Sequence, residues 1–145
     1  MTERLPAELL ALQRERELEG EALRAALAGR ARPGERPEET LFDLGLLSSR
    51  DFALELAARS GLPFLGLRGF LVDERLLLYV PHALALAERV CPIVMVGDSL
   101  KVATAYLEPD LDSVRSRFPH LDIELVVAPR DEILEALSDA AAAVR

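Results

Sequence analysis

The strongest constraint on the fold is a repeated change between strand and helix patterns in the last third of the chain. Residues 93–96 and 101–106 are apolar runs joined by Gly97-Asp98, which predicts an antiparallel hairpin. A helical pattern over 110–118, a third strand over 123–127 and a final helix from 130 to about 142 follow. This order predicts an α+β fold: a three- to four-stranded sheet with helices packed on it.

The first half of the chain has helical spacing instead. Residues 5–29 read as two helices or one bent helix with Leu5, Leu9 and Leu12 on one face, and a Pro- and Gly-rich loop over 31–37 ends this pattern. Another helix is predicted from Glu38 until Gly45 breaks it.

The next helix is predicted from the N-cap residue Ser48 to Ser60-Gly61. We therefore expect a helical subdomain over residues 1–62 and an α+β sandwich subdomain over 63–145. Within the second subdomain, 64–70 reads as a short extended piece, 73–79 as a short helix, and Pro81 as the start of another.

The charge and cysteine content exclude several classes of protein. A net charge of −8 is opposite to that of a nucleic-acid binder, which carries a basic stripe. The lone Cys91 excludes an internal disulfide and a multi-cysteine metal site, and it reads as a small buried residue. No apolar stretch is long enough for a membrane span or a signal peptide. We expect a cytoplasmic protein without direct membrane insertion and without a nucleic-acid partner.

The sequence contains none of the common catalytic motifs. Lys101, the single lysine, is not preceded by the glycines of a phosphate-binding loop. His82 and His120 lie far apart without metal-ligand spacing, and both are expected in solvent. Acid pairs such as Glu38-Glu39 are expected to be solvated helix starts. We therefore expect no enzymatic activity and no metal.

The most specific pattern lies in residues 36–64. Arg36 precedes a short apolar helix, residues 44–47 read Leu-Gly-Leu-Leu, Ser48 opens the next helix, and residues 61–64 read Gly-Leu-Pro-Phe. This stretch resembles the N-terminal domain of type II secretion and type IV pilus assembly ATPases, and weaker matches continue to about residue 139.

The resemblance implies one ligand. Some members of that family bind cyclic di-GMP, and the matching positions here are Arg36, Leu41, Gly45, Leu46, Leu47 and Arg59. However, Glu38 stands at the family's close-approach glycine and places a negative side chain against a ligand with two negative charges. Pro37 and Arg59 also depart from the family's Leu and Gln. We expect no cofactor, and a cyclic di-GMP sensor with a degenerate motif is the alternative.

The favoured interpretation is a non-catalytic protein-interaction or regulatory module of a secretion or pilus assembly system. The resemblance implies this, because the N-terminal domain of the family connects the motor to membrane-bound assembly proteins. Leu5, Leu9 and Leu12 are the candidate partner-binding residues, and packing of these leucines on the body of the same chain is the competing interpretation. A third interpretation is that the chain is the front end of a longer ATPase.

Overall fold

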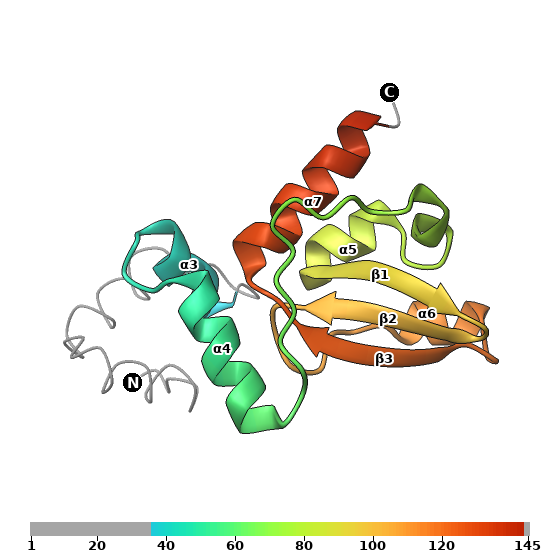
Figure 1. Cartoon of the computed structure of the whole chain (residues 1–145), viewed down its shortest axis with the longest axis horizontal. Helices are drawn as coiled ribbons and strands as arrows, with labels where there is room; N and C mark the ends of the chain where they lie inside the picture. Colours follow the sequence, from blue (N-terminus) through green and yellow to red (C-terminus); the bar gives the residue numbers. More distant parts are fainter. Residues whose placement is uncertain (1–35, 144–145) are drawn as a thin grey trace.

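The computed structural model describes residues 36–143, and Figure 1 shows their arrangement. The helical structure predicted over 5–29, with Leu5, Leu9 and Leu12, lies outside the described residues. The elements are α3 (Pro37–Asp43), α4 (Ser49–Ser60), the 3-10 helix η1 (Glu74–Leu78), α5 (His82–Glu88), β1 (Val90–Val96), β2 (Ser99–Thr104), α6 (Asp112–Arg117), β3 (Asp122–Val127) and α7 (Arg130–Ala143). The predicted α+β fold is confirmed.

Local capping fixes the ends of α4. The Ser48 hydroxyl oxygen accepts a hydrogen bond from the Asp51 backbone N–H at 3.3 Å, which satisfies one of the free donors at the start of the helix. Gly61 ends the helix in the left-handed conformation, and its N–H donates to the Ala57 carbonyl at 3.0 Å. Both ends are the predicted ones.

The three strands lie in the order β1-β2-β3. The hairpin between β1 and β2 is antiparallel as predicted, and Val96 pairs with Ser99 across a two-residue turn. Gly97 has φ +60°, as the first central residue of a type II′ turn requires. Strands β2 and β3 are parallel, and α6 forms part of the crossover between them.

Strand β1 begins three residues earlier than predicted. Val90, Cys91 and Pro92 pair with residues 104, 103 and 102 of β2, and the register shifts between Pro92 and Val94. A proline is tolerated here because β1 is an edge strand and the irregularity absorbs the missing N–H.

The predicted extended piece 64–70 makes only one bridge, in which Phe64 pairs with Val127 in parallel. The Leu65 N–H donates to the Val127 carbonyl, and the Val127 N–H donates to the Pro63 carbonyl, both at 2.8 Å. The segment then leaves the sheet, and the Leu67 N–H donates to Glu132 Oε1 on α7 at 2.7 Å. The Glu132 side chain thus takes the place of the backbone acceptor that a continuing fourth strand would use.

One continuous hydrophobic core joins α3 and α4 to the sheet. Helix α4 contacts both β3 and α7, and Figure 1 shows α3 and α4 beside the base of α7. The largest side chains with less than 2 % exposure come from both parts: Leu41, Leu56, Leu100, Leu111, Ile133 and Leu137. Among residues 36–143, no helix has the length and hydropathy of a membrane span.

Candidate functional site

A buried carboxylate on α3 joins four parts of the fold. Glu39 Oε1 accepts hydrogen bonds from Arg89 Nη2 at 3.0 Å and from Arg130 Nη1 at 2.9 Å. Glu39 Oε2 accepts one from the Tyr106 hydroxyl. Arg89 follows α5, Tyr106 follows β2, and Arg130 begins α7. Only 13 % of the Glu39 side chain is exposed, and the neighbouring Glu38 is 8% exposed, so the expectation of a solvated Glu38-Glu39 pair was wrong.

The charges in this cluster are held in their ionised forms. Burial opposes ionisation of Glu39, but the hydrogen bonds from Arg89, Tyr106 and Arg130 outweigh burial and hold the pKa below its ordinary value of 4.5. Burial likewise disfavours the charge on Arg130, yet hydrogen bonds to Asp43, Glu39 and Asp131 raise the pKa of its guanidinium. We call Glu39, Arg89, Tyr106 and Arg130 the Glu39 cluster.

Arg36 packs against the same cluster from outside. Its guanidinium carbon lies 4.4 Å from the centre of the Tyr106 ring, a cation–π contact. Its Nη1 and Nη2 lie 3.4 Å from the Ala87 carbonyl and 3.5 Å from Glu88 Oε1. The arginine predicted to bind a ligand is therefore occupied by groups of its own chain.

The other predicted site residues from α3 form the end of that helix. The Leu46 N–H donates to the Leu41 carbonyl at 3.0 Å, and the Gly45 N–H donates to the Phe42 carbonyl at 3.1 Å. These two bonds and Gly45 at φ +71° make a Schellman motif. Leu41 and Leu47 are 0 % and 4 % exposed, and Leu46 packs against the core. The Leu-Gly-Leu-Leu pattern is thus explained by the end of α3 and by packing of the leucines in the core.

Arg59 is separated from this group. It lies in the last turn of α4, about 15 Å along the helix from Ser49 at 1.5 Å per residue. Its Nε lies 2.6 Å from Glu55 Oε1 one turn earlier. The structure therefore brings Leu41, Gly45, Leu46 and Leu47 together, with Arg36 at the other end of α3.

The Schellman motif gives a direct test of Gly45. An alanine there is expected to destabilise the protein by about 1 kcal/mol, because an L side chain is strained at positive φ. A Cβ would meet nothing within 4 Å, so the cost is in the backbone. Gly66→Ala is the control, since its φ is ordinary and its Cβ would only touch Glu132 Oε1 at 3.8 Å. Urea unfolding of both variants measures the difference, and equal stabilities would contradict the prediction.

Two further predictions concern single side chains. Cys91 is fully buried as expected, and burial raises the pKa of its thiol to about 12. His82 was expected in solvent, but it is half-buried and its Nε2 lies 3.1 Å from the Leu137 carbonyl oxygen. It therefore links α5 to α7. Within residues 36–143, no group of three acidic, histidine or cysteine side chains could hold a metal ion.

Comparison with known proteins identifies the family. The MshEN domain model matches residues 60–143, which begin directly after Arg59. The solved structure of MshE with cdg is 26% identical, with a TM-score of 0.62, and the match covers 94% of this chain and 99% of that one. An N-terminal domain of XpsE is 27% identical with a TM-score of 0.60 over 94% and 97% of the two chains. A second XpsE form, 24% identical with a TM-score of 0.66 over 94% and 96%, shares the fold.

No curated protein matches this chain. The family model nevertheless covers more than half of it, and the similarity to MshE and XpsE extends over nearly the whole of both chains. The chain belongs to the MshEN domain family, the N-terminal domains of secretion and pilus assembly ATPases.

Proposed function

We propose that this chain is a protein-interaction or regulatory module of a type II secretion or type IV pilus assembly system, acting in the cytoplasm without chemistry of its own. The observation that carries the proposal is the similarity to the MshE and XpsE N-terminal domains along 94% of the chain. These matches are to a domain in front of a motor and not to the motor itself.

The geometry of the described residues supports a role in holding a partner protein. The Glu39 cluster and the shared core fasten α3 and α4 to the sheet and to α7. A module that transmits force or position between two proteins needs such a stiff connection, since a loose joint would lose the binding energy to conformational entropy.

A binding experiment tests the proposal. The purified chain is titrated, by biolayer interferometry, against the cytoplasmic portions of the membrane-bound assembly proteins of its own secretion or pilus system. We expect one of them to bind at micromolar Kd or tighter, and no hydrolysis when ATP or GTP is added. Absence of binding to every one of these proteins, or nucleotide turnover, would contradict the proposal.

Cyclic di-GMP sensing is the second candidate, because the related MshE structure contains cdg. Against it, Arg36 would have to leave Tyr106, Ala87 and Glu88 before it could face a guanine. A bidentate Arg–guanine contact is worth about 1–3 kcal/mol of discrimination between bases. The loss of the Arg36 contacts within the chain would offset much of that gain. Glu39 and Glu88 also place negative charge within the same group of contacts.

Calorimetry separates the two candidates. We expect no binding heat from cyclic di-GMP at a concentration of about 1 mM. A Kd of that order corresponds to a binding free energy of only about −4 kcal/mol. A micromolar Kd that disappears in Arg36→Ala would favour the sensor instead. Arg75→Ala is the matched control, because Arg75 is an exposed arginine whose partner, Asp73, lies on the same short segment.

A further inference from the structure

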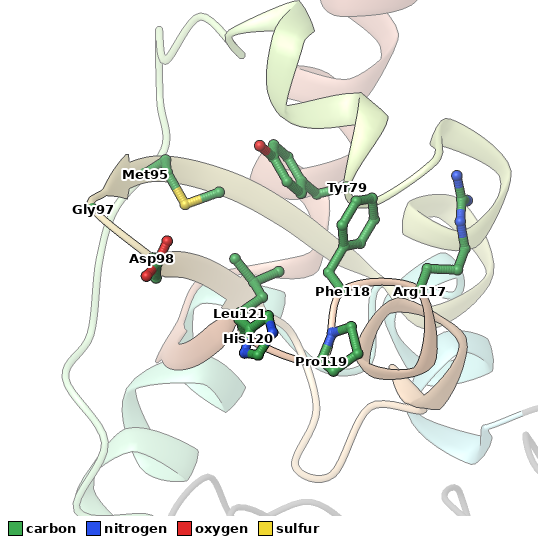
Figure 2. A pocket seen from close by; sticks show the side chains of 9 residues that line it. All are labelled: Tyr79, Met95, Gly97, Asp98, Arg117, Phe118, Pro119, His120 and Leu121. Atoms are coloured by element: carbon green, nitrogen blue, oxygen red, sulfur yellow. The ribbon is translucent and has the colours of Figure 1, made fainter.

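A hollow lies at the hairpin end of the sheet, away from the Glu39 cluster. Its volume is about 270 Å³, and it is an open hollow lined by Tyr79, by the β1–β2 turn and by the connection from α6 to β3. Figure 2 shows the Tyr79 and Phe118 rings on one side, with Met95 and Leu121 beside them. The two ring centres are 4.8 Å apart at 54°, so the two rings contact each other and form one apolar wall.

The edge of the hollow is polar. In Figure 2, Asp98 lies beside Gly97 at the turn, His120 lies next to Leu121, and Arg117 stands on the far side of Phe118. The Arg117 guanidinium carbon lies 5.4 Å from the centre of the Phe118 ring. This contact keeps a positive charge close to the apolar wall.

Arg117 differs from most arginines in residues 36–143, because it has no carboxylate partner among those residues. Ion pairs are formed by Arg36, Arg50, Arg59, Arg75, Arg89, Arg115 and Arg130. An arginine that contacts an aromatic ring and forms no ion pair among these residues is available to an incoming carboxylate.

The size of the hollow limits what it can hold. The volume of about 270 Å³ lies below the roughly 300–1,000 Å³ that is usual for sites of small molecules and cofactors. One bulky side chain fits in such a hollow, and single side chains in pockets supply much of the binding energy of protein interfaces. Met95 adapts to an irregular guest because its thioether side chain is unbranched and flexible.

We propose that this hollow is an anchor site for an acidic segment of a partner protein, which inserts one aromatic side chain and presents a neighbouring carboxylate to Arg117. The inserted ring packs on Tyr79, Phe118 and Met95. This inference rests on the proposed function, since it names the surface and the chemistry by which the module would hold its partner.

Met95 makes the hollow visible to NMR. The chain has two methionines, Met1 and Met95, so ¹³C-methyl-methionine labelling of the whole chain gives two methyl signals. The probe is a synthetic peptide, acetyl-Glu-Glu-Phe-Glu-amide, and the matched control peptide has lysine at every glutamate position. We expect the Met95 signal to shift and saturate with the acidic peptide, and to need at least ten times more of the lysine peptide.

Charge reversal gives the matching protein variants. Arg117→Glu is expected to weaken the binding of the acidic peptide at least tenfold. Arg115 lies on the same helix but pairs with Asp112 at 3.8 Å. Arg115→Glu is therefore expected to change the affinity for the acidic peptide less than threefold. Both side chains are exposed, so both variants should melt within a few degrees of the parent.

The outcomes separate this inference from the proposed function. An unmoved Met95 signal, or equal shifts with both peptides, overturns the anchor site. If the acidic peptide binds but no assembly protein does, the proposed function fails while the anchor site stands. If an assembly protein binds without moving Met95 or without weakening in Arg117→Glu, the interaction role stands and the anchor site is wrong.

Discussion

Replacing Glu39 with alanine is expected to lower the free energy of unfolding by about 3–5 kcal/mol, the usual cost of removing one partner from a buried ion pair. The change leaves the Arg130 side chain, which is 10 % exposed, without one of its carboxylates, and it leaves the buried Tyr106 hydroxyl without its acceptor. Urea denaturation followed by circular dichroism measures the loss.

The control is Glu55→Ala on α4. Glu55 forms an ion pair with Arg59 at 2.6 Å one turn away, and the Arg59 side chain is 44 % exposed. A pair of this kind contributes below about 1 kcal/mol, because solvent screens it. If Glu39→Ala were no more destabilising than Glu55→Ala, the Glu39 cluster would not be what fastens α3 to the sheet.

The same carboxylate gives the protein a defined response to acid. The folded state holds the pKa of Glu39 below 4.5, so protonating Glu39 costs more in the folded than in the unfolded chain. Its contribution is therefore complete above pH 4.5 and is lost as the pH falls through the lowered pKa. We expect the stability difference between the parent and Glu39→Gln to be constant from pH 8 to 6 and to shrink below pH 4.5. A constant difference down to pH 3 would contradict this assignment.

The parts of the fold that the sequence predicted are those decided by neighbours in the chain. Ser48 caps α4 through Asp51, and Gly97 forms a two-residue turn. Each depends on residues within three positions, so the pattern alone carries the information. The start of β1 was missed because Pro92 looks like a strand breaker, and its place on an edge strand is known only once the strand order is known.

The candidate site was predicted less well for the same reason. The Leu-Gly-Leu-Leu pattern located the end of α3, because a Schellman motif is local. The Glu39 cluster was not predicted, since the partners of Glu39 lie 50 to 91 positions away from it in the sequence. A glutamate in the first turn of a helix ordinarily faces solvent, and nothing nearby in the sequence indicates that Arg89 and Arg130 converge on it.

Leu41→Ala is expected to destabilise the chain by about 2–5 kcal/mol, as for other fully buried leucines. The Leu41 side chain is 0 % exposed in a core that continues to β2 and α7. Helix α3 has only seven residues, so the vacated space is expected to loosen its attachment as well. Thermal melting should show a lower Tm by roughly 5–15 °C, at about 3 °C per kcal/mol for a protein of this size.

Leu44→Ala is the matched control, because Leu44 caps the same helix and is 39% exposed. Its loss should cost less than about 1 kcal/mol, as is usual for a surface position. The comparison decides what the family motif means in this chain. If Leu41 is a ligand contact, its alanine variant keeps the parent's stability and loses only binding. If Leu41 belongs to the core, stability falls first, and any loss of binding by the variant follows from the weakened attachment of α3.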